Sequence, residues 1–215
     1  MTIIVHHLEN SRSQRVLWML EELGLPYEVR RYERDKKTML APPELRAVHP
    51  LGKSPVVEDS DEQHDGRNRV VAETGAIAEY LVDKADGRLG PPSRRDDALA
   101  WRFWLHYAEG SLMPPLLLLL VLGRIPLVGK RAAKRIRPML DRHLDFVEAT
   151  LAKQPWFAGD AMTAADVMMS FPLEAAVSRG GLGASRPATM AWLEKIHARP
   201  AYRKALAIGG PYAYA

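Results

Sequence analysis

The sequence of 215 residues predicts an α/β N-terminal domain followed by an all-α C-terminal domain. Over residues 2–83, short β-branched runs alternate with stretches that place apolar residues at helical spacing. Strand signals largely disappear after a Gly- and Pro-rich stretch, residues 86–93. We therefore expect one domain over 1–85, a linker over 86–93, and a helical domain over 94–215.

The N-terminal part predicts a small mixed sheet covered by helices. Ile3, Ile4 and Val5 form a β-branched run typical of a buried strand, and Gly24 is a typical helix end. The expected elements are a strand over 2–8, a helix that carries Val16 to Leu23 and ends at Gly24 and Pro26, a strand over 27–32, a short helix after residue 43, strands at 55–57 and 70–71, and a helix over 74–83. The polar stretch 59–68 predicts a long hairpin loop.

The C-terminal part predicts helices only. The spacing of apolar residues indicates helices over 97–122, 130–151, 163–177, 187–198 and 201–208. The first of these is either one long helix or a pair broken near Pro114 and Pro115, and Pro172 predicts a kink in the third. Thr163 and Asp166 have the spacing of a capping box, which is a folding signal and not a catalytic one.

The composition excludes several kinds of chemistry. The sequence contains no cysteine, which removes disulfides, iron–sulfur clusters, thiolate zinc sites and cysteine nucleophiles. His6 and His7 are adjacent on a predicted strand, so their side chains point to opposite faces and cannot share a metal ion. No two histidines are four residues apart, the spacing that places two ligands on one face of a helix. We therefore expect no metal site.

The charge balance is mildly basic, with 30 Lys and Arg against 26 Asp and Glu. The densest basic cluster falls at helical spacing and contains no aromatic or base-reading side chains, so it does not predict a nucleic-acid partner. We interpret it as a solvated helix face; a field that attracts small anions is the alternative. The cluster consists of Lys130, Arg131, Lys134, Arg135 and Arg137.

No segment predicts membrane insertion or export. The longest apolar run, Leu116 to Leu122, is far shorter than the roughly 20 residues that span a bilayer. The N-terminus lacks a basic segment followed by an apolar stretch, so we expect no signal peptide. We therefore expect a cytoplasmic protein without a membrane partner, and the absence of cysteine fits a reducing compartment.

Three short polar segments have an ordinary structural interpretation beside a functional one. The segment 10–13, Asn-Ser-Arg-Ser, is typical of a helix cap, yet the start of a helix also stabilises anions. Ser54-Pro55 opens a strand with a residue that lacks a backbone donor, and cis X-Pro bonds are retained for a reason. Glu73-Thr74 combines an ordinary N-cap with a preceding carboxylate that directly follows an apolar run.

Four motifs stand in order along the chain, and each is weak alone. They are Ser11 after the first strand, Val48 to Val56 with the proline, Glu73-Thr74, and Phe157 to Asp160 followed by Thr163 to Asp166. Together they resemble the glutathione S-transferase family across essentially the whole chain. The N-terminal part looks like that family's thioredoxin-like domain and the C-terminal part like its helical domain. The stretch Ser11 to Tyr27 looks most like the bacterial and fungal serine-type members.

The resemblance implies a glutathione transferase that conjugates the thiolate of its co-substrate glutathione to small hydrophobic electrophiles, a detoxification activity. It implies that the Ser11 hydroxyl, with the start of the following helix, favours the thiolate, which is the reactive form of a thiol. Ser54 would offer its backbone groups to the cysteinyl part of glutathione, and a cis Pro55 would aim those groups. Glu73 and Thr74 would hold the γ-glutamyl end.

Two assignments of the glutathione site stay open. Asn10 or Ser13 could replace Ser11, because element boundaries are uncertain by one or two residues; the spacing of four between Ser11 and Arg15 favours Ser11, as in the serine classes. Lys53 is the candidate for the glycine carboxylate of glutathione. The chain has no cysteine and no tyrosine before its second strand, so the cysteine and tyrosine classes do not fit.

In the family, the electrophile site lies between the domains and is lined by the first helix of the helical domain. Trp104, Tyr107, Ser111 and Met113 are the candidates here, and packing is their ordinary interpretation. The family also implies a homodimer in which the first domain of one subunit meets the helical domain of the other. A glutathione-dependent peroxidase or disulfide reductase, or a non-catalytic regulatory or binding protein of the same fold, are the alternatives.

Overall fold

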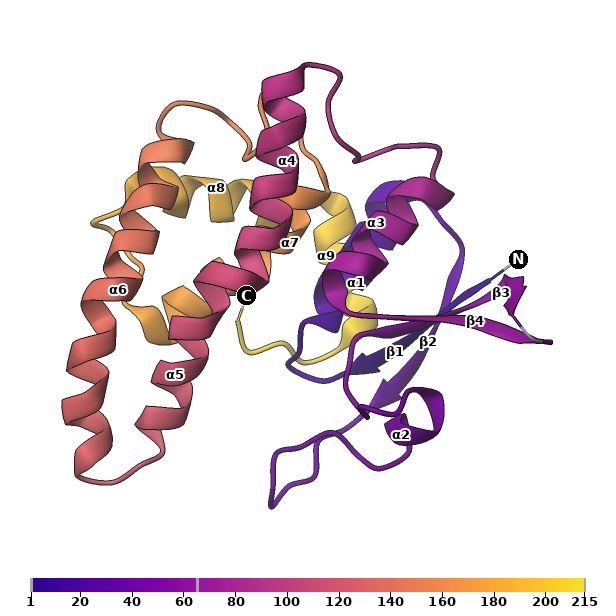
Figure 1. The fold of residues 1–215 in the computed structure, drawn as a ribbon, viewed down its shortest axis with the longest axis horizontal. Coiled ribbons are helices and arrows are strands. Elements are labelled where there is room, and N and C mark those ends of the chain that lie inside the picture. The colour runs from indigo at the N-terminus through magenta and orange to yellow at the C-terminus, as the bar shows by residue number, and fades with distance from the viewer. Residues whose placement is uncertain (1, 65, 215) are drawn as a thin grey trace. The chain divides into compact units, whose positions relative to one another are not determined.

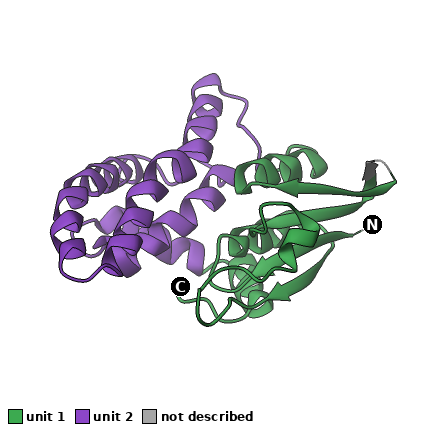
Figure 2. Ribbon diagram, turned by 60° about the horizontal axis from the view of Figure 1, so that its bottom comes forward, with its two compact units in different colours: residues 1–88, 198–213 green, residues 89–197, 214–215 purple. Residues whose placement is uncertain are grey.

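The computed structural model describes residues 2–64 and 66–214, and these form two compact units (Figure 2). Unit 1 comprises residues 1–88 and 198–213, and unit 2 comprises residues 89–197 and 214–215. The expected helical domain began at residue 94 and ran to the C-terminus, whereas residues 198–213 cluster with the N-terminal part. The physical reason is that the last helix packs against the first one.

Unit 1 is built on a four-stranded mixed sheet, which confirms the predicted α/β class (Figure 1). The strands lie in the order β2-β1-β3-β4; β1 and β2 are parallel, whereas the β1–β3 and β3–β4 pairs are antiparallel. The strands are β1 (Ile3–Leu8), β2 (Tyr27–Tyr32), β3 (Val56–His64) and β4 (Arg67–Ala72). The helices of this unit are α1 (Ser13–Leu23), α2 (Leu45–Val48), α3 (Thr74–Lys84) and α9 (Pro200–Gly209).

The prediction of a long loop over 59–68 is wrong, because β3 and β4 continue through most of this segment. Charged side chains stabilise the paired strands instead of solvating a loop. The Tyr80 hydroxyl donates to the buried Asp59 carboxylate at 2.6 Å, and Lys84 forms an ion pair with it at 2.7 Å. Arg69 on β4 pairs with Glu62 on β3 at 2.7 Å. A strand that carries polar side chains on both faces thus has the same composition as a loop, and the sequence pattern does not distinguish the two.

α9 belongs to unit 1 because it packs closely on α1. A Cβ added at Gly209 would collide with the side chain of Gln14 on α1, so glycine allows this approach. Arg199 forms a bidentate ion pair with Glu22, with nitrogen–oxygen distances of 2.5 and 2.8 Å. These contacts bring a segment that is distant in sequence to the helix that begins at the predicted site.

Unit 2 is helical, as predicted. It contains α4 (Arg95–Tyr107), a π-helical segment η1 (Ala108–Leu112), α5 (Met113–Gly123), α6 (Val128–Leu151), α7 (Ala164–Ala175), a second π-helical segment η2 (Ala176–Gly180) and α8 (Pro187–His197). The irregularity expected near Pro114 and Pro115 is η1, which directly precedes them. Proline lacks an N–H group, so the carbonyls one turn earlier lose their usual partners.

The predicted capping box is present at the start of α7. The Thr163 N–H donates to the Asp166 carboxylate at 2.8 Å, and its hydroxyl does so at 3.1 Å. The Phe157 N–H donates to the other carboxylate oxygen at 3.0 Å. Asp166 is fully buried, and this burial raises the pKa of its carboxyl to about 6. The cluster joins the 156–160 turn to α7.

Candidate functional site

The junction between β1 and α1 brings three polar side chains together in a hydrogen-bond chain. The Ser11 and Ser13 hydroxyl oxygens lie 2.7 Å apart, and the Ser13 oxygen lies 2.9 Å from Nδ1 of His7. All three side chains are buried, Ser11 to 6% exposure and Ser13 to none. The chain therefore runs from the edge of the junction into the interior of unit 1.

The direction of each hydrogen bond follows from the far end of this chain. The His7 ring also bonds to the backbone of Gly209, whose carbonyl only accepts; since Nδ1 faces the Ser13 oxygen, we assign the proton to Nε2. Burial lowers the pKa of His7 to about 4, and the ring is neutral at pH 7. Nδ1 therefore accepts from the Ser13 hydroxyl, and the Ser13 oxygen in turn accepts from the Ser11 hydroxyl.

The neighbouring His6 has a different set of partners, as strand alternation predicts. Its Nδ1 lies 2.8 Å from the Tyr32 hydroxyl, and its Nε2 lies 2.8 Å from the Glu58 carboxylate. None of the hydrogen bonds described for its side chain reaches the serines of the junction. His6 and His7 are thus two buried histidines of equal depth, of which one is connected to Ser11.

Asn10 and Ser13, the two alternatives to Ser11, already have hydrogen-bond partners within unit 1. The Asn10 side-chain oxygen accepts from the Ala213 N–H at 2.7 Å, and its backbone has a left-handed φ of 48°. The Ser13 oxygen also accepts from the Leu8 N–H at 3.2 Å. Ser11 is therefore the hydroxyl of this segment that lies nearest to the surface and has the fewest fixed partners.

Ser54 and Pro55 lie beside the end of β1. The peptide bond between them is cis, as the resemblance implies. The Ser54 hydroxyl donates to the His6 carbonyl at 2.8 Å and accepts from the Leu8 N–H at 3.3 Å. Among the described residues, the Ser54 N–H and carbonyl have no backbone partner. This arrangement leaves the main chain of one residue available to pair with an added peptide strand.

Glu73 and Thr74 form the start of α3. Glu73 has a left-handed φ of 73°, which is costly for a residue with a side chain and is a feature that clusters at functional sites. Its carboxylate is exposed and makes no hydrogen bond or ion pair with the described residues, and the same is true of the exposed Lys53 ammonium. Thr74 is buried at the helix start, where the first N–H groups lack helical partners.

The four electrophile-site candidates lie in unit 2, and three of them are buried. Trp104 packs between Tyr107, Phe146 and Phe157, with ring centroids 4.7–5.2 Å apart. The Tyr107 hydroxyl lies 2.5 Å from Nδ1 of His143, and burial raises its pKa to about 12. Met113 is buried, and Ser111 is half-buried in η1.

Comparison with known proteins decides the family. Glutathione S-transferase, N-terminal domain, matches residues 11–84, and glutathione S-transferase, C-terminal domain, matches residues 111–200. Glutathione S-transferase 1 of Saccharomyces cerevisiae is 33% identical over 231 residues, which cover 98% of each chain. The chain belongs to the glutathione S-transferase family.

Solved structures of glutathione transferases agree with the assignment of this chain to the family. A glutathione S-transferase from Actinobacillus pleuropneumoniae superposes with a TM-score of 0.84 at 35% identity, covering 96% of this chain and 92% of that one. A glutathione transferase from Burkholderia graminis superposes with a TM-score of 0.81 at 26% identity, covering 95% and 87%. The latter structure has two glutathione molecules bound per subunit.

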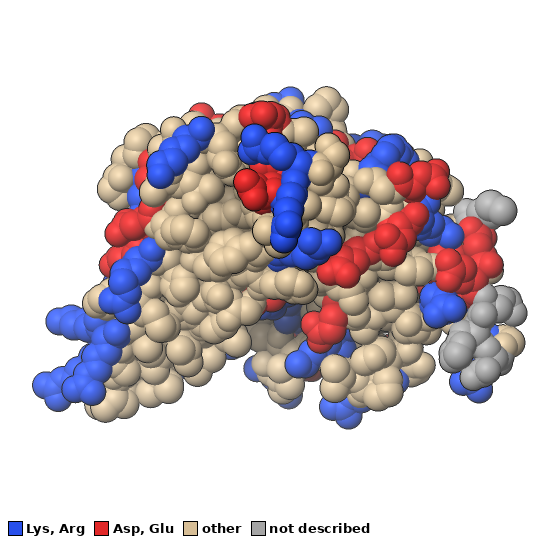
Figure 3. All heavy atoms as spheres, turned by 45° about the horizontal axis from the view of Figure 1, so that its top comes forward, with Lys and Arg blue, Asp and Glu red and all other residues tan. Residues whose placement is uncertain are grey.

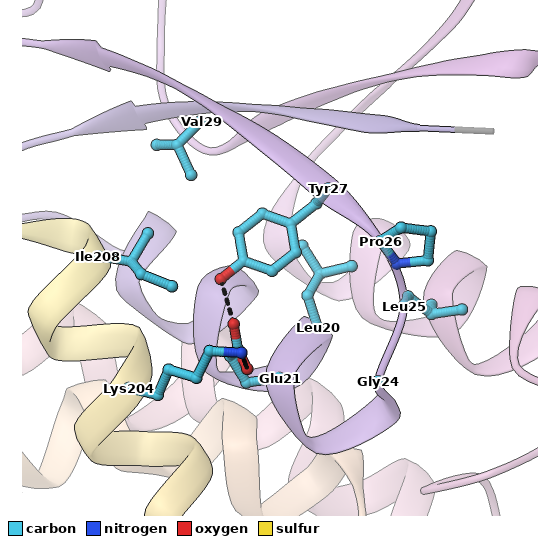
Figure 4. Close-up of a pocket in the computed structure, with 9 residues that line it drawn as sticks. All are labelled: Leu20, Glu21, Gly24, Leu25, Pro26, Tyr27, Val29, Lys204 and Ile208. Carbon is cyan, nitrogen blue, oxygen red and sulfur yellow. Dashed lines mark hydrogen bonds and ion pairs between the residues drawn. The ribbon is translucent and has the colours of Figure 1, made fainter.

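A cavity of about 440 Å³ in unit 1 of the transferase has none of the predicted glutathione residues among those that line it (Figure 4). It is bounded by the end of α1, the start of β2 and α9. Its polar groups are already paired: the Tyr27 hydroxyl donates to Glu21 at 2.6 Å, and Lys204 pairs with Glu21 at 2.8 Å. We therefore base the candidate glutathione site on the main chain of Ser54 and on the exposed charges of Glu73 and Lys53, and not on the size of a cavity.

Sequence reasoning missed His7 and Gly209 as parts of this junction. The adjacent pair His6-His7 was noticed, but only as a metal site to be excluded. A histidine six residues before a serine carries no motif, and Gly209 lies near the other end of the chain. Only the packing of α9 on α1 brings the two together.

Proposed function

We propose that this glutathione transferase ionises the thiol of glutathione at Ser11 and conjugates the thiolate to small hydrophobic electrophiles. The observation that carries the proposal is the order of the hydrogen-bond chain at the β1–α1 junction. Ser13 is fully buried and donates to His7, and Asn10 holds the backbone of Ala213. Ser11 is the hydroxyl that remains at the edge of this chain, two residues before α1.

The chemistry requires the Ser11 hydroxyl to change its acceptor. In the structure it donates to Ser13, whose oxygen also accepts from the Leu8 N–H. When the hydroxyl turns to the sulfur of glutathione, the Ser13 oxygen keeps that second donor, so no buried acceptor is left without a partner. The thiol proton leaves to solvent. The thiolate then attacks the electrophilic carbon, a C–S bond forms, and the leaving group departs with its electron pair.

The remaining residues of unit 1 bind the glutathione backbone. The N–H and carbonyl of Ser54, which have no backbone partner among the described residues, pair with the cysteinyl part in the manner of an added strand. The Glu73 carboxylate pairs with the γ-glutamyl ammonium, and Thr74 with the start of α3 binds the neighbouring carboxylate. The Lys53 ammonium is exposed and accounts for the glycine carboxylate.

In unit 2 we propose Trp104, Tyr107, Ser111 and Met113 as electrophile-site residues. We also propose that the enzyme is a cytoplasmic homodimer with a role in detoxification. The half-exposed apolar side chains Leu99 and Phe103 on α4 and Phe146 on α6 support an interface between copies, because Phe103 and Phe146 lie 6.0 Å apart in one patch.

Calorimetric titration of glutathione, in two buffers of different ionisation enthalpy near pH 7, tests the proposal. The wild type is expected to release close to one proton on binding. Ser11→Ala is expected to bind glutathione with little proton release, and its kcat should fall about a hundredfold, the usual effect of removing one donor to a developing anion. Full proton release and turnover in Ser11→Ala would overturn the assignment to Ser11.

Glu73→Ala tests the binding role separately from the chemical one. Loss of one charged partner at an exposed position is expected to weaken glutathione binding about tenfold, while proton release per bound molecule stays close to one. Wild-type affinity in Glu73→Ala would remove this residue from the site. Absence of glutathione binding in the wild type would instead favour a regulatory protein of the same fold.

A further inference from the structure

We propose that the end of unit 2 where α5 meets α6 docks on an anionic membrane surface. We name this region the α5–α6 tip. It presents exposed apolar side chains from the end of α5, the connecting turn and the start of α6, and a basic segment of α6 continues from it. The apolar residues of the tip are Leu117, Leu118, Val121, Ile125, Leu127 and Val128.

The apolar exposure at the tip is unusually high. Leu127 is 94% exposed and Val128 is 66% exposed, and the other four side chains are 42–49% exposed. Leu117, Leu118 and Val121 share the face of α5 opposite to the buried Leu116 and Leu119. A contiguous apolar surface of this kind on a water-soluble unit marks an interaction site.

The backbone holds the tip in this shape. Leu127 has a left-handed φ of 62°, a costly conformation for a leucine, and it places the most exposed apolar side chain at the apex of the turn. A Cβ added at Gly129 would collide with the carbonyl of Leu122, so glycine allows the end of α5 to approach the start of α6. The exposed leucine is therefore part of an ordered turn between two packed helices.

The charge around the tip has one sign. Residues 110–140 contain six Lys and Arg and no Asp or Glu, whereas the rest of the chain contains 24 basic and 26 acidic residues. The whole positive charge of the protein thus comes from this segment. Figure 3 shows Lys and Arg side chains gathered at the lower left, beside uncharged residues. Arg124, Lys130, Arg131, Lys134 and Arg135 are exposed and form no ion pair with the described residues.

Apolar and basic residues together select the partner. An anionic bilayer accepts apolar side chains below its headgroups and attracts Lys and Arg at its surface. A second copy of the chain would meet the tip with the same positive charge if the contact were symmetric, which is unfavourable. A nucleic acid would not contact leucine and valine, and the tip has no aromatic side chain for stacking.

Docking at the surface requires no membrane span. The helical stretch Arg95–Gly123 is the one in the described part of the chain that is long and apolar enough to cross a bilayer. Of its most apolar window, 44% is buried inside the protein, and one such helix is weak evidence for a membrane span. The sequence led us to expect no membrane partner because no run is long enough to span; the exposed tip argues for peripheral contact.

Vesicle flotation tests the proposal with the full-length enzyme. The wild type is expected to float with vesicles of equal parts phosphatidylcholine and phosphatidylserine, to float little with phosphatidylcholine alone, and to be released by salt. The double variant Leu127→Ser/Val128→Ser should weaken binding at least about tenfold. The charge variant Lys130→Gln/Arg131→Gln/Lys134→Gln/Arg135→Gln should weaken it on the order of a thousandfold.

Two further leucines provide a matched control. Leu40 is 67% exposed and Leu51 is 59% exposed, and both lie in unit 1. Leu40→Ser/Leu51→Ser removes a similar apolar area and is expected to leave vesicle binding unchanged. The proposal is overturned if the wild type does not prefer anionic vesicles, or if the serine variants at the tip bind them as well as the control. A change of oligomeric state in the tip variant with unchanged vesicle binding would also overturn it.

Discussion

The β1–α1 junction and the α5–α6 tip reverse the ordinary distribution of side chains in opposite ways. At the junction, Ser11, Ser13 and His7 are polar and buried, and each has a hydrogen-bond partner. At the tip, Leu127 and Val128 are apolar and exposed, with basic residues beside them. Both arrangements depart from what stability alone favours, and such departures are the informative ones for function.

The two regions should therefore respond differently to substitution. A buried hydrogen-bond chain is a cooperative part of the fold, because removing one member leaves its partners without hydrogen bonds in a place that water does not reach. An exposed apolar side chain contributes little to folding, so its removal affects only what binds to it. Stability measurements can separate these two cases before any ligand is added.

The largest effect is expected for His7→Leu. The change leaves the Gly209 carbonyl without its partner and leaves the Ser13 hydroxyl only the Leu8 carbonyl at 3.3 Å as an acceptor, which should lower the free energy of unfolding by about 2–5 kcal/mol in urea titration. His6→Leu is the control, since His6 is equally buried but contacts Tyr32 and Glu58. It should also destabilise, yet keep turnover per folded molecule, whereas His7→Leu should lower it. Equal turnover in the two variants would separate His7 from the function of Ser11.

The pH dependence of stability gives the second effect. The pKa of His7 falls from 6.5 to about 4 on folding because the ring is buried, so in this range the unfolded chain binds a proton that the folded one does not. Stability should therefore decrease by about 3 kcal/mol as the pH falls from 6.5 to 4. Urea titrations at both pH values measure the difference. If the free energy of unfolding of the wild type depended on pH as little as that of His7→Leu, His7 would not be the group that links stability to pH.

A buried polar cluster away from the site sharpens the comparison. Thr163→Ala removes one member of the capping box at α7 and should lower the free energy of unfolding by about 0.5–2 kcal/mol. The kcat of the folded variant should equal that of the wild type, because the box joins two segments of unit 2 and contains no predicted site residue. A large kinetic defect in the well-folded variant would contradict this separation of folding from chemistry.

The smallest effect is expected at the tip. Leu127→Ser should change the free energy of unfolding by no more than about 0.5 kcal/mol, since the side chain is 94% exposed and packs on little. Thermal unfolding of the variant beside the wild type provides the measurement. A destabilisation as large as that of Thr163→Ala would mean that Leu127 is buried in solution, and the contrast between the two regions would then disappear.

Local patterns predicted most elements of the fold, whereas the assignment of the polar segments to a glutathione site stays a prediction. β1 and α1 follow from signals a few residues long, whereas the cis Ser54–Pro55 bond was implied by the resemblance to the family. The sequence predicts a loop where the structure has the β3–β4 hairpin. The partners of Asp59 are Tyr80 and Lys84, and both lie on α3, outside the segment itself. Composition alone cannot distinguish a polar strand pair from a loop.

Long-range contacts account for what remained hidden. The bond between His7 and Gly209 depends on the packing of α9 on α1, which no local spacing encodes. The tip was missed for another reason. A run of five leucines, residues 116–120, has no hydrophobic periodicity, so the sequence does not reveal which leucines face outward. The apolar run of α5 and the basic cluster of α6 are separate signals in the sequence, and only the structure places them side by side.

The return of residues 198–213 to unit 1 has a consequence for synthesis on the ribosome. The helix α1 emerges well before α9, its packing partner, because α1 ends at Leu23 and α9 begins only at Pro200. At about 5–20 residues per second, α1 waits on the order of ten seconds for this contact. Unit 2 is essentially one continuous stretch, 89–197, and can complete its fold sooner. Folding of the nascent chain is thus expected to finish at its N-terminal unit.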